Sequence, residues 1–201
     1  MPKATFYNLP DEKKMTLIGA LKTEFSRVPL FEASISNIVK EAGIPRGSFY
    51  QYFEDKEDAF FFLLNNLAEQ EKNHFLSLLQ THDGDLFKTV IEFFERLLDE
   101  KEHFHFIKNA LLHMTQQVER CFSQIITDNN QHSESFKKTV SLIDKTHLNI
   151  SCEKDLLHVL NIITSIMFRN LAEAYAHSVS RQESLNHFKT ELRLIQKGLV
   201  R

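Results

Sequence analysis

Glycine and proline are scarce in this chain, and their scarcity restricts the folds that it can adopt. Only 5 Gly and 4 Pro occur among 201 residues. A sandwich or barrel of many strands needs a turn signal roughly every 8–12 residues, which so few turn residues cannot supply. Because 42% of the residues are apolar, the chain can still bury a core. The sequence therefore predicts an all-α protein.

The cysteines and the apolar stretches indicate the compartment. Cys121 and Cys152 are the only cysteines, and no signal peptide follows Met1, which is typical of a reduced cytoplasmic protein. We interpret both cysteines as small core residues. The longest apolar stretch, 159–168, is interrupted by polar residues and is far shorter than the roughly 20 residues that span a bilayer. We expect a cytoplasmic protein with no membrane partner.

The formal net charge of −3 is unevenly distributed. Residues 1–56 carry a net charge of +1 and the remaining residues a net charge of −4. This distribution argues against a protein that coats nucleic acid non-specifically. It is compatible with a DNA contact that is confined to the N-terminal part.

Local signals predict two helices in the first 43 residues. The first begins near Asn8, with Pro10 in its opening turn, and ends before Pro29. A short second helix follows, with Ser34 as its N-cap and Gly43 in the left-handed position just past its end.

A third short helix is predicted from Arg46 or Gly47 to Phe53. It starts only a few residues after the second helix ends. Two short helices joined by a tight turn that contains glycine form a helix-turn-helix.

The rest of the chain shows longer helical patterns. Asp55 can cap a long helix that ends near residues 82–85, with Asp58 at the capping-box position. A fifth helix is predicted around 86–98 and a sixth around 104–114, with a break near 127–131.

The last two predicted helices differ from the others. Residues 156–176 are apolar nearly all round, so this helix must be buried on every side. Residues 185–199 carry a narrow apolar seam that suits one partner helix. We expect both helices to pair with their copies in a homodimer, through residues 156–199. The alternative is that they only close the core of the monomer.

The stretch SISNIVKEAGIPRGSFYQYFEDKE, residues 34–57, resembles the DNA-binding segment of TetR-like (TetR/AcrR) transcriptional regulators. The shared pattern is a Ser-led helix, Ala-Gly-Ile, a short turn, Gly-Ser, an aromatic pair, a Phe and a Lys-Glu pair. The resemblance covers roughly residues 10–60. It implies a three-helix DNA-binding domain over 1–55 and a helical effector-binding and dimerisation domain over 56–201.

Helical spacing separates inward from outward residues in the third helix. Phe49 and Phe53 are four residues apart and point to the core, so the polar residues between them face outward. An exposed Arg46 can reach guanine or a phosphate, and Gln51 can pair with adenine. The resemblance adds the start of the second helix. The expected DNA contacts are Ser34, Ser36, Arg46, Gly47, Ser48, Tyr50, Gln51, Tyr52 and Lys56.

Three of these residues have a purely structural alternative. Ser34 can act as a helix cap only, and Tyr52 can pack on the first helix. Lys56 can be a solvated charge at a helix start.

The resemblance also implies that a small molecule binds in the second domain. The body of the chain is rich in Phe, which favours an apolar pocket with a few polar groups. The alternative is an ordinary aromatic core. The candidate pocket residues are Phe93, Phe104, Asn109, His113, Met114, Phe168 and Arg169.

No nucleotide-binding, metalloprotease or nucleophile-elbow motif is present, so we expect no enzyme activity and no cofactor. His103 and His105 are two residues apart, which does not suit a metal site on a helix. The sequence therefore predicts a homodimeric, DNA-binding repressor that a small apolar effector releases from a palindromic operator. The alternative function is an all-helical small-molecule carrier or sensor that does not bind DNA.

Overall fold

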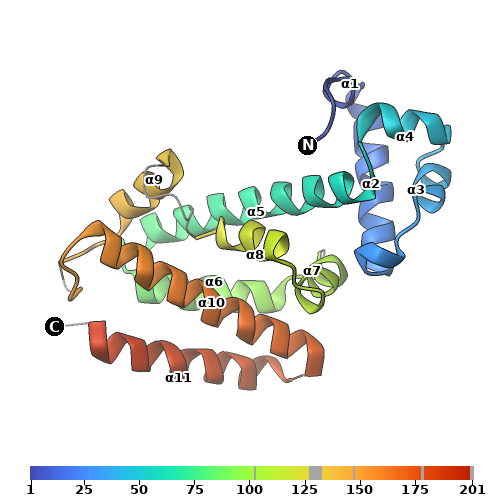
Figure 1. Ribbon diagram of the computed structural model, residues 1–201. Helices are drawn as coiled ribbons and strands as arrows, with labels where there is room; N and C mark the ends of the chain where they lie inside the picture. Colours follow the sequence, from blue (N-terminus) through green and yellow to red (C-terminus); the bar gives the residue numbers. More distant parts are fainter. Residues whose placement is uncertain (102, 127–132, 147, 178, 200–201) are drawn as a thin grey trace. The chain divides into compact units, whose positions relative to one another are not determined.

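The computed structural model describes residues 1–101, 103–126, 133–146, 148–177 and 179–199, and every regular element in these ranges is a helix (Figure 1). The prediction of an all-α fold is confirmed. The helices are α1 (Ala4–Tyr7), α2 (Asp11–Arg27), the 3-10 turn η1 (Leu30–Glu32), α3 (Ile35–Glu41), α4 (Arg46–Tyr52), α5 (Lys56–Thr81), α6 (Leu86–Asp99), α7 (Phe104–Leu112), α8 (Gln116–Ser123), α9 (Glu134–Leu142), α10 (Glu153–His177) and α11 (Arg181–Leu199).

The helices form two compact units. Unit 1 comprises Met1–Leu67 and Lys101–Val118, and unit 2 comprises Ala68–Glu100 and Glu119–Arg201. Helix α5 contributes its first part to unit 1 and the rest to unit 2. The predicted domains, 1–55 and 56–201, remain a prediction.

Unit 1 is built on α2, which packs against α3 and α7. The helix starts after Pro10 and has two acidic residues in its first turn. Their negative charges interact favourably with the positive end of the helix dipole. Its buried face includes Leu21 and Phe25, and the Phe25 ring meets the Phe60 ring edge-on at a centroid distance of 5.3 Å. This core is the platform for the helices α3 and α4.

The start of α5 follows the predicted capping signal. The backbone N–H of Asp58 donates to Asp55 Oδ1 at 2.7 Å, and the N–H of Glu54 donates to Asp58 Oδ2 at 3.2 Å. The first bond satisfies a backbone donor that the first turn of a helix leaves unpaired, and the second ties Glu54, which precedes the cap, to the same turn.

Unit 2 is centred on the helices α6, α10 and α11. Figure 1 shows α10 and α11 side by side, and α6 packs against both. The rings of Phe94 and Phe188 lie 4.2 Å apart between α6 and α11. Helix α10 buries Leu160, Ile163 and neighbouring residues, but Ile162 is 50% exposed, so one chain does not bury α10 on every side.

Short elements escaped prediction. The helices α1, α8 and α9 have four to nine residues, and η1 has three. Helices this short gain little stability from intrinsic propensity, and tertiary packing supplies most of it. The predicted break near 127–131 lies outside the described residues.

Candidate nucleic-acid interface

The turn between α3 and α4 matches its prediction. Gly43 has φ +63°, in the left-handed region, and the N–H of Ile44 donates to Val39 O at 3.0 Å. This pairing closes the C-terminal end of α3 with a glycine at the position that favours it most. The turn brings the start of α4 directly after α3.

Helix α4 buries one side and exposes the other. Phe49 and Phe53 are fully buried, together with Ile38 of α3. On the outer side, Arg46 and Gln51 are exposed and Tyr50 is 40% exposed. Ser48 and Tyr52 are half-buried, and a Cβ at the exposed Gly47 would meet no atom within 4 Å.

Arg46 is held by polar contacts within this outer face. Its Nη1 donates to Ser36 Oγ at 2.7 Å, and its Nη2 lies 3.3 Å from the Tyr50 hydroxyl. The guanidinium carbon also lies 6.0 Å from the centroid of the Tyr50 ring. These contacts pre-orient a side chain that can hydrogen-bond a guanine edge or a phosphate. Three of the predicted contact residues therefore form one cluster.

Lys56 is neither a solvated charge nor an isolated side chain. Its ammonium donates to Phe31 O at 2.9 Å and to Ala33 O at 3.2 Å. It therefore ties the start of α5 to the link between α2 and α3.

Glu24 is a residue of this region that sequence analysis missed. Its carboxylate, on α2, accepts hydrogen bonds from Arg27 (2.8 Å), from the backbone N–H of Ser34 (2.7 Å) and from the Asn37 amide (3.2 Å). Burial alone would raise the pKa of Glu24, but these hydrogen bonds outweigh it and hold that pKa below its ordinary value.

Ser34 occupies the predicted N-cap position of α3, but its side chain makes no capping hydrogen bond. The carboxylate of Glu24 binds the Ser34 N–H instead. The Ser34 hydroxyl is therefore not needed as the cap of α3.

The N-terminal segment binds the far end of α4. Lys3 Nζ donates to Tyr50 O at 2.8 Å, the Lys3 N–H donates to Tyr52 O at 2.8 Å, and the Thr5 hydroxyl donates to Gln51 O. The last carbonyl groups of a helix have no partner within the helix, so these donors cap α4. The Phe6 ring, 1% exposed, anchors the segment against Phe53 at a centroid distance of 5.2 Å.

The candidate effector residues fall in both units. Asn109 and His113 line one pocket in unit 1, and Phe104 and Met114 belong to the same unit. Phe93 and Phe168 are buried in unit 2, where they pack on Phe75 and Phe122. Arg169, also in unit 2, is exposed and pairs with Glu173 and Glu191. The effector pocket remains a prediction.

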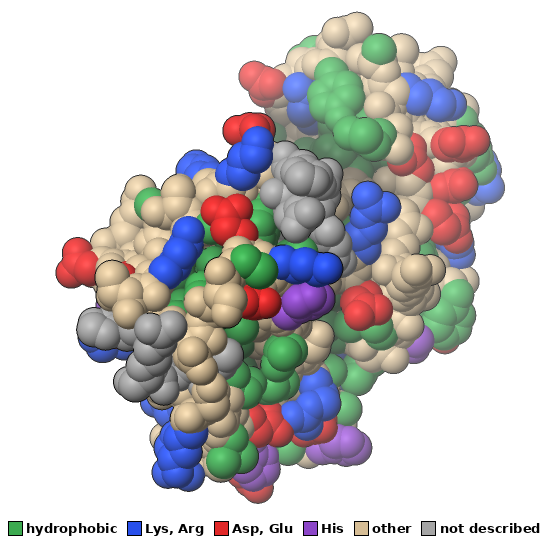
Figure 2. Space-filling model, turned by 60° about the vertical axis from the view of Figure 1, so that its left-hand side comes forward, with side chains coloured by type: hydrophobic (Ala, Val, Ile, Leu, Met, Phe, Trp, Pro, Cys, Tyr) green, Lys and Arg blue, Asp and Glu red, His purple; other side chains and the backbone are tan. Residues whose placement is uncertain are grey.

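The surface charge is mixed. Figure 2 shows Lys and Arg side chains interspersed with Asp and Glu over the face in view. Within the described ranges, no group of three or more His, Cys, Asp or Glu side chains has the arrangement of a metal site. No helix in the part that the structure describes is both long and apolar enough to cross a bilayer.

The geometry of unit 1 is that of a helix-turn-helix DNA-binding protein. A short helix with outward Arg, Gln and Tyr residues follows a second helix across a tight turn, on a platform that α2 supplies.

Comparison with known proteins agrees with this class. Residues 17–61 match the family model described as bacterial regulatory proteins, tetR family, and residues 85–199 match the model of the tetracyclin repressor-like C-terminal domain. The chain belongs to the TetR family, and it is a DNA-binding transcriptional regulator.

Similar proteins include the HTH-type transcriptional regulators YdgC and YuxN of Bacillus subtilis. The chain is 28% identical to YdgC over 144 residues, which are 65% of this chain and 74% of YdgC. It is 26% identical to YuxN over 121 residues. This aligned segment makes up 58% of the present chain but only 41% of YuxN.

A TetR-family regulator from Streptomyces coelicolor has a similar fold, with a TM-score of 0.67 and 17% identity over 94% of this chain and 82% of that one.

Proposed function

We propose that the chain is a homodimeric repressor that binds a near-palindromic operator, with α4 of each subunit in the major groove. The observation that carries this proposal is the outer face of α4, where Arg46, Tyr50 and Gln51 are exposed over a fully buried Phe49. Exposed Arg and Gln side chains on the outer face of a recognition helix suit base readout.

The proposed contacts divide into two kinds. Arg46 and Gln51 would read base edges, with Ser48 beside them. The remaining contacts would be to phosphates, which set the register on DNA; they come from Tyr50, Tyr52, Lys56, the N-cap Ser34 and Ser36 of α3. Gly47, with open space at its Cα, would let the start of α4 approach the DNA backbone.

The dimer is proposed to form through α10 and α11, within residues 156–199. Ile162 of α10 is 50% exposed and Leu194 of α11 is 62% exposed. Residues three or seven apart share a helix face. Ile162 therefore lies on the same side of α10 as Arg169, and Leu194 lies on the same side of α11 as Glu191, the ion-pair partner of Arg169. On this surface Ile162 and Leu194 are exposed apolar side chains among polar neighbours such as Ser165 and Arg169.

The finer assignments follow from this function. A small apolar effector is proposed to release the operator from the repressor, which would act in the cytoplasm. The proposed division of labour is DNA binding by residues 1–55 and effector binding and dimerisation by residues 56–201.

A footprint on the DNA that flanks the gene tests the function. We expect protection of two half-sites about one helical turn apart, and a gel shift that weakens with salt. If the dimer neutralises about 6–10 phosphates, its affinity falls roughly 10³–10⁵-fold between about 50 and 200 mM salt. Absence of any shift at low salt would instead support the small-molecule carrier.

A further inference from the structure

A pocket of about 480 Å³ lies within unit 1 against the link between α2 and α3. Its walls are largely apolar and include Leu30 and Phe31 of η1, Phe60 and Phe61 of α5, and Val118 of α8. The exposed Phe31 ring meets the His113 ring edge-on at a centroid distance of 5.3 Å. Sites of this size and composition bind small organic molecules.

Two polar groups fixed at this pocket, those of Asn109 and His113, present hydrogen-bond acceptors. The Asn109 amide nitrogen donates both its hydrogens, to Phe25 O and Ser26 O at 3.1 Å each, which leaves Oδ1 as the available group. His113 Nδ1 lies 3.0 Å from Asn109 O. Because a carbonyl oxygen only accepts, Nδ1 carries the proton, and Nε2 of a neutral ring is an acceptor.

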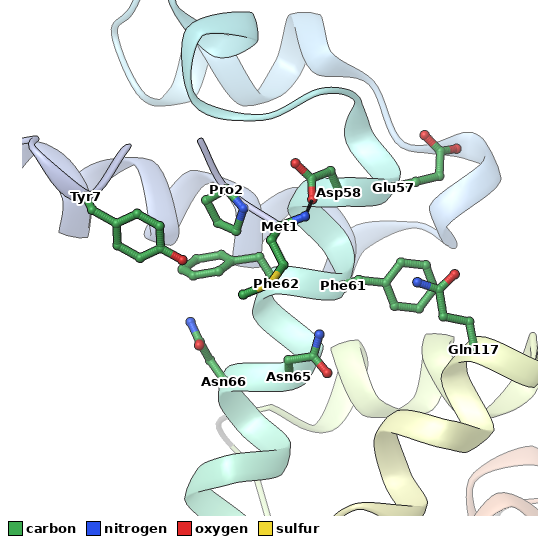
Figure 3. A pocket seen from close by; sticks show the side chains of 10 residues that line it. All are labelled: Met1, Pro2, Tyr7, Glu57, Asp58, Phe61, Phe62, Asn65, Asn66 and Gln117. Atoms are coloured by element: carbon green, nitrogen blue, oxygen red, sulfur yellow. Dashed lines mark hydrogen bonds and ion pairs between the residues drawn. The ribbon is translucent and has the colours of Figure 1, made fainter. Parts of the chain in front are cut away.

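The Glu57 carboxylate completes the pocket lining. Figure 3 shows the neighbouring pocket, where the ammonium of Met1 is paired with Asp58. Glu57 precedes Asp58 in the first turn of α5 and lines both pockets, as does Phe61. Among the described residues, no cation pairs with Glu57. Of the two adjacent carboxylates, only Asp58 has a cationic partner among the residues that the structure describes.

We propose that this pocket binds an aromatic or similarly apolar molecule that carries a cationic amine. The rings of Phe31, Phe60 and Phe61 would cover its apolar part, and Glu57 would accept the ammonium group. The Glu57 carboxylate would repel an aromatic anion of the same size, so the site discriminates by charge.

A molecule in this pocket would change the position of the link that leads into α3. Leu30 and Phe31 belong to η1, which ends two residues before the N-cap of α3. Lys56 holds the same link through Phe31 O and Ala33 O. A ligand that separates the Phe31 and His113 rings must displace this link, and it lowers the affinity for DNA. This regulatory step rests on the proposed function.

Binding is tested without DNA, on the full chain, with a matched pair of fluorescent probes. The probes are 1-naphthylmethylammonium and 1-naphthoate, followed by the anisotropy of the naphthyl ring. We expect saturable binding of the cation at least about tenfold tighter than that of the anion, a difference of about 1.4 kcal/mol.

Two substitutions locate the site. Glu57→Gln keeps the shape but removes the charge, and it is expected to abolish the preference for the cation. Phe31→Ser, at a 64% exposed position, is expected to weaken both probes several-fold. The matched controls are Glu12→Gln and Met15→Ser, both at exposed positions of α2 outside the pocket, and they should leave both affinities unchanged. Equal binding of the two probes, or a preference that survives Glu57→Gln, would overturn the proposal.

The regulatory step is measured on the footprinted operator as the ratio of Kd values with and without saturating cation. We expect Kd to rise at least about fivefold in the wild type, and the ratio to return toward one in Glu57→Gln. Cation binding with an unchanged ratio overturns the regulatory step alone. A chain that protects no DNA but still prefers the cation overturns the proposed function and leaves the binding site standing.

Discussion

The carboxylate of Glu24 in α2 accepts the backbone N–H of Ser34, ten residues further along the chain, at 2.7 Å. The same carboxylate binds Asn37 in the first turn of α3. An acidic group from another helix thus caps α3 and fixes its start against α2. The position of α3 determines where α4 begins, so this contact supports the DNA-binding face.

Glu24→Gln should destabilise the chain. The substitution weakens bonds to Arg27, Ser34 and Asn37, and a buried hydrogen bond to a charged group contributes about 1–3 kcal/mol. We expect a loss of about 2 kcal/mol in urea unfolding at pH 7. Glu12→Gln, at an exposed site of the same helix, should be neutral, and an equal loss there would refute the role of Glu24.

The effect of Glu24 should depend on pH in a defined direction. Its pKa is lower in the folded chain than its ordinary value of 4.5, so its contribution is complete above that pH. As the pH falls through the folded-state pKa, the folded chain must take up a proton and the contribution disappears. The difference in unfolding free energy between wild type and Glu24→Gln should therefore shrink as the pH falls below 4.5. A difference that stays constant over this range contradicts the assignment.

Lys3→Ala should weaken DNA binding without changing the preferred sequence. Lys3 Nζ binds Tyr50 O at the end of α4, so its loss removes one of the three hydrogen bonds that cap a seven-residue helix. We expect a several-fold rise in Kd for all operator sequences, measured by gel shift. Lys13→Ala removes the same charge from an exposed site of α2 and serves as the control. If both variants weaken binding equally, the effect is electrostatic and the cap is not responsible.

Arg46→Ala should relax sequence preference more than it lowers overall affinity. A bidentate contact between Arg and guanine discriminates by about 1–3 kcal/mol per base pair. Competition between the operator and single-base variants measures this discrimination. Arg120→Ala, at an exposed position of α8 in unit 2, should leave it intact. A uniform loss over all variants would mean that Arg46 contacts only phosphate.

Charged residues on the outer face of α10 and α11 should disrupt the dimer. Ile162→Asp and Leu194→Asp each place a carboxylate at an exposed apolar position of this face. We expect a dimer in the wild type and a monomer in both variants, by light scattering at micromolar concentration. Met15→Asp, at a 72% exposed position of α2, should remain dimeric. A monomeric wild type would overturn the proposed interface.

Gly84→Ala should cost more stability than Gly43→Ala. Both glycines have a positive φ, which costs another residue about 1–2 kcal/mol. A Cβ at Gly84 would also lie 2.4 Å from Leu142 O and 2.6 Å from Asp144 N, whereas a Cβ at Gly43 meets nothing within 4 Å. Urea unfolding of the two variants measures the difference. Equal losses would show that the close approach at Gly84 is relieved without cost.

Much of the candidate interface was predictable because its signals are local. The turn at Gly43, the spacing of Phe49 and Phe53, and the bond from Asp58 N–H to Asp55 all involve residues at most five apart. Spacing alone also separated Arg46 and Gln51 from the core. Short elements such as α1 could not be predicted, because tertiary packing of Phe6 rather than periodicity holds them in place.

The sequence by itself determined that the chain is helical, where its tight turn lies and which face of α4 is exposed, because these properties depend on neighbouring residues. Only the tertiary structure decided that Glu24 caps α3, that Lys3 caps α4, and that Glu57 has no counter-ion among the described residues. The first two contacts join residues that are 10 and 47 positions apart, and the third depends on which charged side chains come close to Glu57. They are set when helices pack, and no periodicity of the sequence encodes them.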